Sequence, residues 1–285
     1  MKRRVFLLIL LIFTTSCTPK YIPLNMPDCP PPPPPIENVR VALVLGGGGF
    51  KGMAHVGVLE IFERHGIPID LIVGTSVGSA IGALYADHPN AVDLKNKLMK
   101  VKKWEILDLS ILNGLRSLFD LIAPIQGLYY ENYLRKQLNS KEIEDLNIPL
   151  VVVTTDIINN EIYLIRSGPI VPAVHASSAV PPFFSPVKIY HRTLVDGGVL
   201  EPVPVTIAKK FNPKVIISID IASKPETGGL SNMLNLTYKS ISLYYYELSR
   251  LKCQCSDFDI HPNLEGLGLF DDDKKELLYE RGLKN

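Results

Sequence analysis

The chain of 285 residues has few cysteines and almost no net charge. Cys17 lies in the leader, so three cysteines remain beyond it, and an odd number predicts no complete disulfide framework. Cys253 and Cys255 are too close for an unstrained bridge and lack the four-ligand spacing of a zinc site. We therefore expect the cysteines to be incidental. The formal net charge of +1 carries no signature of nucleic-acid binding.

The apolar run of residues 5–13 is too short to span a bilayer. A basic start precedes it and Thr14-Thr15-Ser16-Cys17 follows, which is the layout of a secretory signal. A small residue before cysteine resembles the cleavage box of bacterial lipoproteins, which implies lipidation of Cys17. Thr14 departs from that box, where leucine is usual. An ordinary signal peptide cut near the same place is the alternative.

Residues 18–38 separate this leader of residues 1–17 from the rest of the chain. Six consecutive prolines, Pro30–Pro35, predict a stiff spacer of about 3.1 Å per residue that would hold a domain off a membrane. The leader predicts an exported protein, anchored in the bacterial cell envelope through Cys17. By resemblance to lipoprotein sorting, Thr18 in place of aspartate after the cysteine allows the outer membrane as its location. Residues 39–285 are enough for one large core, or for a core with a small cap.

Residues 71–80 contain the pattern G-x-S-x-G between a β-branched run and a small-residue run that favours a helix. Gly74 and Gly78 flank Ser76, as a sharp turn from strand to helix requires, and such a turn exposes the hydroxyl above a sheet. The following helix directs free N–H groups and its positive dipole end at the same point, where Val77 is a candidate oxyanion donor. The pattern predicts a nucleophile elbow. A tight turn with a serine N-cap is the alternative.

A glycine-rich turn, Gly46–Gly52, follows the apolar run 40–45 and precedes a helical pattern over 53–62. Its glycines satisfy G-x-G-x-x-G, which is typical of dinucleotide binding. That function needs an acidic residue near the end of the next strand, about 20 residues on, whereas Asp70 precedes that strand. A glycine loop at a helix N-terminus holds any anion, including a tetrahedral oxyanion.

A third motif places Asp196 in a tight glycine turn after a short apolar run. Alone, it is typical of an ordinary Asp-Gly hairpin turn. A Ser-His-Asp triad in hydrolase order needs a histidine after the aspartate, and only His261 follows, in a polar tail. His175 is the one histidine expected near the site. A carboxylate acting directly on Ser76 is the simpler proposal, because desolvation can raise its basicity.

The three motifs, in this order and spacing, resemble the patatin-like phospholipases. The resemblance implies that Gly47, Gly48 and Gly49 supply the oxyanion hole. It also implies that Ser76 is the nucleophile and Asp196 the base of a Ser–Asp dyad. The remaining motif positions are Lys51, Gly52, Gly74, Gly78, Gly197 and Gly198.

The resemblance runs from about residue 39 to about residue 221. Runs rich in valine and isoleucine alternate with helical patterns, which predicts a mostly parallel central α/β sheet flanked by helices. The resemblance implies the patatin-like fold, which is related to three-layer α/β hydrolases. Asn159-Asn160 predicts a hairpin before Asp196. The expected strands are 40–45, 71–73, 148–155 and 215–220.

Residues 88–140 interrupt this alternation. We expect two helices there that either pack on the core or form a cap holding an acyl chain over Ser76. Five lysines between residues 95 and 103 predict a solvated face, or a surface for anionic lipid headgroups. A tyrosine-rich helix is expected over 234–252.

Together the patterns predict a serine acyl hydrolase that cleaves fatty acyl esters of phospholipids or related lipids through an acyl-enzyme. No metal and no organic cofactor is required. The expected partners are a lipid ester and, through lipidated Cys17, a membrane, with no nucleic acid and no obligate protein partner. The alternative is a membrane-anchored lipoprotein that keeps the fold as a binding module.

Overall fold

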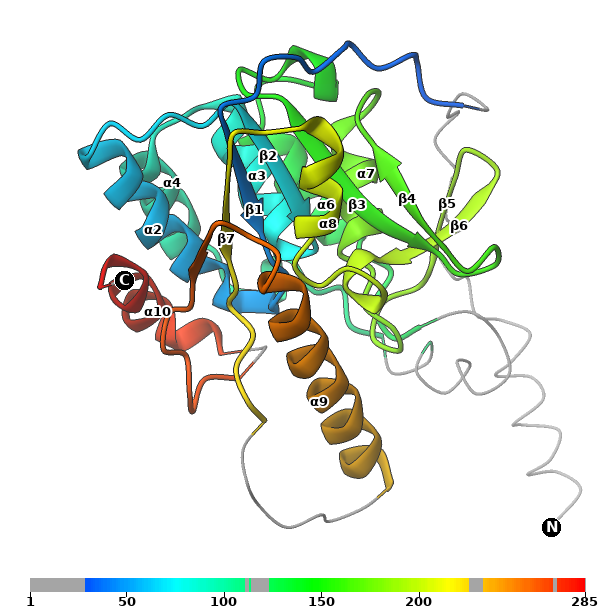
Figure 1. The fold of residues 1–285 in the computed structure, drawn as a ribbon. Coiled ribbons are helices and arrows are strands. Elements are labelled where there is room, and N and C mark those ends of the chain that lie inside the picture. The colour runs from blue at the N-terminus through cyan, green and yellow to red at the C-terminus, as the bar shows by residue number, and fades with distance from the viewer. Residues whose placement is uncertain (1–28, 111–112, 114–122, 226–232, 269–270, 285) are drawn as a thin grey trace, which may run out of the picture.

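The computed structural model describes residues 29–110, 113, 123–225, 233–268 and 271–284, and it shows a sheet with helices on both faces (Figure 1). The strands are β1 (Val41–Leu45), β2 (Leu71–Thr75), β3 (Leu150–Asp156), β4 (Glu161–Ile165), β5 (Val187–Ile189), β6 (Arg192–Asp196), β7 (Val215–Ile219) and β8 (Phe258–Ile260). The helices are α2 (Met53–Arg64), α3 (Val77–Asp87), α4 (Ala91–Lys100), α6 (Leu128–Gln137), α7 (Ile170–Ser177), α8 (Val205–Ala208), α9 (Met233–Cys253) and α10 (Lys275–Leu283).

The strands form one sheet in the order β5-β6-β3-β2-β1-β7-β8, with β4 paired to β3. The pairs β3–β2, β2–β1, β1–β7 and β7–β8 are parallel, whereas β4, β5 and β6 pair antiparallel. This confirms the predicted mostly parallel α/β sheet. The pairing of β4 with β3 also confirms the hairpin predicted at Asn159-Asn160.

Alternate side chains of β1 pack into two separate cores, one on each face of the sheet. The molecule therefore has three layers: helices, the sheet, and helices again. Leu43 and Leu45 pack with apolar residues of α2 and α3. Ala42 and Val44 pack with α8 on the opposite face. Because both faces are covered, β1 has no polar face, and its sequence is a continuous apolar run.

Two strands end beside each other along β3, and this brings distant parts of the sequence together. β2 runs parallel to the first half of β3, so that Thr75 is paired with Val153. β6 runs antiparallel to the second half, so that Asp196 is paired with Thr154. The residue after β2 and the last residue of β6 therefore lie at neighbouring positions, although 120 residues separate them in sequence.

The C-terminal helices lie at the carboxyl-end side of the parallel strands (Figure 1). α10 crosses α2 closely, since a Cβ at Gly282 would lie 2.2 Å from the carbonyl oxygen of Ala54. α9 projects from the body of the molecule. Lys252, near the end of α9, holds it to buried Glu201 through an ion pair of 2.5 Å.

The interrupting region contains α4 and α6, as expected, while residues 111–112 and 114–122 lie outside the described part. Three of the five lysines between residues 95 and 103 form ion pairs with carboxylates of the same molecule. Lys95 pairs with Glu276 at 2.7 Å, Lys97 with Asp93 at 2.9 Å, and Lys103 with Asp272 at 3.7 Å. These pairs weaken the interpretation of the run as a free cationic surface for headgroups.

The proline run Pro30–Pro35 is extended and touches the domain. The Ser167 hydroxyl donates to the carbonyl oxygen of Pro31, and Ile36 packs against the core. The end of the predicted spacer is thus attached to the domain. Among the described residues, no helix is both long and apolar enough to cross a membrane.

Candidate active site

Ser76 occupies the sharp turn from β2 into α3, with φ 56° and ψ −128°. A non-glycine residue with positive φ is strained, and such strain is typical of a nucleophile elbow. A Cβ at Gly78 would lie 2.1 Å from the carbonyl oxygen of Leu45, and one at Gly74 would lie 2.7 Å from backbone atoms of α3. The two glycines therefore allow α3 to pack directly on the strand ends. The Ser76 side chain makes no capping hydrogen bond, which argues against the N-cap alternative.

Neighbouring serines fix the backbone of the elbow. The Ser76 N–H donates to Ser177 Oγ at 2.9 Å, and Ser177 Oγ donates to the carbonyl oxygen of Val153 at 2.6 Å. Ser79 Oγ donates to the carbonyl oxygen of Ser76 at 2.6 Å. The backbone of Ser76 is thus held on both sides, while its hydroxyl stays available.

Asp196, at the end of β6, is only 3% exposed and faces Ser76. Its Oδ1 accepts a hydrogen bond from the N–H of Gly198 at 2.6 Å. Burial raises the pKa of Asp196 to about 6, against smaller lowering effects of the Ser76 hydroxyl and the Gly198 N–H. Oδ2 has no hydrogen bond in the described part of the chain, although the Ser76 hydroxyl lies close enough to the carboxyl to lower its pKa. Catalytic hydrogen bonds are often long in free enzymes.

The glycine loop lies beside this pair, but its donors differ from those expected. The Gly47 N–H donates to the carbonyl oxygen of Pro202 at 2.9 Å, so it is not free to bind an oxyanion. The N–H groups of Gly48, Gly49 and Val77 have no acceptor among the described residues. These three N–H groups are therefore the ones free to bind an oxyanion, whereas the N–H of Gly47, which was also expected to do so, already has a backbone acceptor.

Because Gly47 has no side chain, Ser76 and Tyr245 can both lie close to the glycine loop. A Cβ there would lie 3.0 Å from Ser76 Cβ and 2.2 Å from the hydroxyl of Tyr245. Two side chains hold the rest of the loop. His55 donates from Nε2 to the carbonyl oxygen of Gly46 at 2.8 Å, and burial lowers its pKa to about 4, so it is neutral. Lys51 Nζ donates to Ser223 Oγ at 2.6 Å, and burial lowers its pKa to about 8.

Tyr245 of α9 is a site residue that the sequence did not indicate. A Cβ at Gly198 would lie 2.6 Å from its ring and 3.2 Å from its hydroxyl. The phenol thus lies between Gly47 and Gly198, beside Ser76 and Asp196. Burial, with the nearby Asp196 carboxylate, raises the pKa of Tyr245 well above its usual value, so the hydroxyl keeps its proton. Within the described residues this hydroxyl has no hydrogen-bond partner.

The histidines considered for a triad have other contacts. His175 Nδ1 pairs with Glu131 at 2.8 Å, and its Nε2 lies against Gly127. His261 contacts Asp259 and Asp220. No histidine of the described part forms a hydrogen bond with Ser76 or Asp196. The Ser76 hydroxyl therefore lies beside a buried carboxylate, with no histidine of the described part between them.

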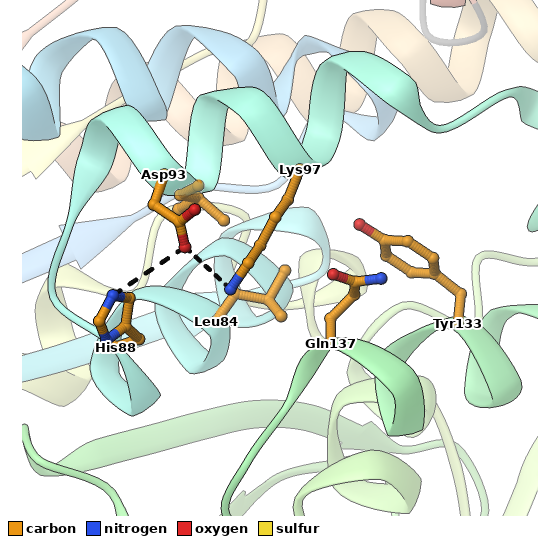
Figure 2. A pocket seen from close by; sticks show the side chains of 7 residues that line it. Leu84, His88, Asp93, Lys97, Tyr133 and Gln137 are labelled. Atoms are coloured by element: carbon orange, nitrogen blue, oxygen red, sulfur yellow. Dashed lines mark ion pairs between the residues drawn. The ribbon is translucent and has the colours of Figure 1, made fainter.

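A small hollow between α4 and α6 is separate from this site (Figure 2). Its volume is about 10 Å³, which is room for about one water molecule. Asp93 lies across it between Lys97 and His88, with contacts of 2.9 Å and 4.0 Å. None of these residues belongs to the site around Ser76, and the hollow is too small for a lipid.

Asp70 lies at the opposite end of β2 from Ser76. It accepts hydrogen bonds from the N–H groups of Arg40 and Val41 at 3.0 Å and 2.9 Å. This acid therefore fixes the starts of the strands and cannot meet a ribose beside the glycine loop. The dinucleotide alternative has no support in the geometry.

The sequence model of the patatin-like phospholipase family matches residues 43–209. Among relatives, the lysophospholipase NTE1 of Scheffersomyces stipitis is 38% identical over 192 residues, which cover 66% of this chain and 12% of that protein. The human patatin-like phospholipase domain-containing protein 6 is 36% identical over 194 residues, which cover 66% of this chain and 14% of that protein. The chain thus matches only a small part of these relatives.

A solved structure with a related arrangement is that of VipD from Legionella pneumophila. The similarity covers 73% of this chain and 53% of that one, with 15% sequence identity and a TM-score of 0.40.

Proposed function

Because this chain belongs to the patatin-like phospholipase family, we propose that it cleaves fatty acyl esters of phospholipids or related lipids through a Ser76–Asp196 dyad. The observation that carries the proposal is the strained Ser76 elbow beside a buried carboxylate whose Oδ2 is unpaired in the described structure. Its relatives with lysophospholipase and phospholipase names support a lipid ester as substrate.

In the first step, Ser76 Oγ attacks the ester carbonyl carbon and Asp196 Oδ2 accepts the hydroxyl proton. A pKa of about 6 leaves Asp196 ionised at neutral pH, yet more basic than an ordinary aspartate. The proton then passes from Asp196 to the leaving alcohol, and an acyl-Ser76 ester remains. In the second step, Asp196 takes a proton from water as the water oxygen attacks the acyl-enzyme carbonyl. The Ser76 Oγ–acyl bond then breaks, the proton returns from Asp196 to Ser76 Oγ, and the fatty acid is released.

The negative charge that develops on the carbonyl oxygen needs donors already in place. The N–H groups of Gly48, Gly49 and Val77 supply them, and the start of α3 adds its positive dipole end. The Tyr245 hydroxyl is a fourth donor within reach of the same position. Because its pKa is raised, it acts as a hydrogen-bond donor and not as a base.

The surface of α9 suits a lipid substrate. The helix carries Tyr245 on its inner side, and it exposes large apolar side chains to solvent on other sides. Exposed apolar groups of this kind mark contact with apolar partners, including membranes. The exposed residues are Met233, Leu236, Tyr238, Ile241, Leu243, Tyr244 and Leu251.

The proposed activity is tested by incubating the purified protein with phosphatidylcholine and lysophosphatidylcholine and extracting the lipids. Wild type should release fatty acid from at least one of them. Ser76→Ala should abolish release while keeping the circular dichroism spectrum of wild type. A folded wild type that releases no fatty acid, and is not labelled by a fluorophosphonate, would favour the binding-module alternative.

We further propose that residues 1–17 are a lipoprotein leader, that Cys17 carries the lipid, and that residues 18–38 form the connection to the catalytic domain of residues 39–285. The basic, apolar and small-residue order of the leader supports this. This proposal places the protein in the bacterial cell envelope, at the outer membrane. Anchoring would keep the site close to its lipid substrate.

A further inference from the structure

A carboxylate, a thiol and an imidazole converge at the carboxyl ends of β7 and β8, outside the Ser76–Asp196 pair. Ile219 of β7 is paired with Ile260 of β8, so the next residues, Asp220 and His261, lie at the same level of neighbouring strands. Cys253, the last residue of α9, completes the group. One ligand atom from each of the three residues lies within 4.8 Å of the others.

The two inner members of this group are almost fully buried. Asp220 is 1% exposed and Cys253 is 2% exposed. Asp220 Oδ1 accepts a hydrogen bond from the N–H of Ala222 at 2.8 Å. Oδ2 accepts none from the described residues and lies 3.4 Å from His261 Nδ1. A buried carboxylate oxygen with free lone pairs, aimed at a thiol and an imidazole, is a ready position for a cation.

A second carboxylate fixes the orientation of the imidazole. His261 Nε2 contacts Asp259 Oδ2, and Asp259 Oδ1 accepts a hydrogen bond from Ser218 Oγ at 2.8 Å. When the ring is neutral and Nε2 donates to Asp259, Nδ1 carries the free lone pair and faces Asp220. Histidine ligands of metals are commonly held by a carboxylate on their other nitrogen in this way.

We propose that Asp220, Cys253 and His261 bind a zinc ion, with water as the fourth ligand. Thiolate and imidazole are the ligands that zinc prefers, and carboxylate is also common. One thiolate, one carboxylate and a neutral imidazole balance the charge of Zn²⁺. Tetrahedral ligation requires ligand atoms about 3.3–3.8 Å apart. The His261 side chain is 44% exposed, so it can close the remaining distance, and it leaves the ion a path to solvent.

The site would join three separate segments, β7, β8 and the end of α9. α9 also carries Tyr245, two turns before Cys253, so the ion would help to hold the phenol beside Gly47. No sequence pattern predicts this site, since Cys253-Gln-Cys255 lacks the spacing of zinc ligands and Asp220 and His261 belong to no motif. The proposal does not depend on the hydrolase function, because metal content is measured without a substrate.

The test is the zinc content of the full chain, produced without a histidine tag, equilibrated with zinc, desalted and measured by plasma mass spectrometry. Wild type should retain one zinc per chain. Cys253→Ser and His261→Ala should retain less than about a tenth of that under the same desalting. Cys255→Ser, which changes an exposed cysteine two residues away, should retain the wild-type amount. Asp259→Asn should weaken zinc binding by about 10-fold to 100-fold.

A spectroscopic measurement on wild type avoids dependence on variants that fail to fold. Cobalt(II) bound at this site should give the ultraviolet charge-transfer band of a thiolate ligand together with the visible bands of tetrahedral cobalt. Labelling of Ser76 by a fluorophosphonate is a separate check that the site around Ser76 is folded in each preparation. Wild type that retains no more zinc than Cys253→Ser, or cobalt without a thiolate band, would overturn the proposal and leave His261 as an ion-paired bridge between Asp220 and Asp259.

Discussion

At the scale of single residues, the proposed mechanism depends on burying a carboxylate beside a serine. Asp196 lies at the end of a strand where one oxygen is held by the Gly198 N–H and the other is left for the proton of Ser76. Its removal from water raises the pKa to about 6. The protein thus gains a stronger base, and the folded state carries the cost of a buried charge.

Asp196→Asn should therefore inactivate the enzyme and stabilise the fold. The folded pKa of Asp196 lies above that of the unfolded chain, so the favourable contribution of the protonated form is lost as pH rises through about 6. The rise of about two in the pKa of Asp196 corresponds to a loss of about 3 kcal/mol from the free energy of unfolding at pH 8. Asparagine removes this cost, and the rate should fall by at least about 100-fold.

The measurement is urea unfolding of wild type and Asp196→Asn at pH 8 and at pH 4.5, with ester hydrolysis at pH 8. Relative to wild type, Asp196→Asn should raise the free energy of unfolding strongly at pH 8 and much less at pH 4.5. Asp70→Asn is the control. It should lower the stability of the fold at pH 8, because hydrogen bonding to Arg40 lowers the pKa of Asp70. A destabilised and active Asp196→Asn would contradict this account of the base.

Tyr245→Phe removes one oxygen atom beside the reacting groups and leaves the ring in place. Loss of a preorganised donor should lower kcat by about 10-fold to 100-fold and change KM little. Stability should stay the same or rise, because the hydroxyl has no partner in the described structure. Tyr244→Phe is the matched control, since that neighbour is 76% exposed. Equal rates for the two variants would show that Tyr245 only packs.

At the scale of elements, the site forms where β2 and β6 end side by side along β3. The elbow also requires α3 to approach the end of β1 without a side chain between them. Gly78→Ala would place a Cβ 2.1 Å from the carbonyl oxygen of Leu45, a backbone atom that cannot rotate away. We expect loss of nearly all activity and a destabilisation of about 1–3 kcal/mol. Thermal unfolding and ester hydrolysis measure the two effects, and a fully active Gly78→Ala would show that the packing is looser than described.

Much of this element-level arrangement could be predicted from the sequence. The apolar runs at β1, β2, β3 and β7, the two glycine turns and the β3–β4 hairpin are local patterns, because buried parallel strands and tight turns restrict residue type at short range. The position of Ser76 follows from such a pattern. Asp196 does not, because its turn alone is typical of a hairpin, and it was identified by the resemblance of the three motifs together.

The parts that the sequence did not reveal depend on long-range contacts. Gly47 was expected to donate to the oxyanion, but its acceptor, Pro202, lies more than 150 residues away. Tyr245 is one of several tyrosines in α9, and nothing local marks the one that meets Gly47. The convergence of Asp220 with Cys253 likewise follows from where α9 ends and not from any spacing.

At the scale of the whole molecule, we propose that a leader of residues 1–17 and a proline-rich connection of residues 18–38 precede the catalytic domain. If Cys17 is lipidated, Cys17→Ser should move the protein from the membrane fraction to the soluble or precursor pool and abolish incorporation of labelled palmitate. The activity of residues 39–285 on detergent-dispersed ester should be nearly that of the full chain, because the dyad lies outside the connection. Wild type that takes up no palmitate and fractionates as soluble would leave the leader as a secretion signal only.

We propose that Ser76 is the covalent nucleophile, activated by Asp196 without a histidine. Intact-mass and peptide mass spectrometry of the protein after treatment with a fluorophosphonate tests this directly. We expect one adduct per chain on the peptide containing Ser76, no adduct in Ser76→Ala, slowed labelling in Asp196→Asn, and labelling retained in His175→Ala and His261→Ala. An adduct that persists in Ser76→Ala, or a histidine variant as unreactive as Ser76→Ala, would contradict it.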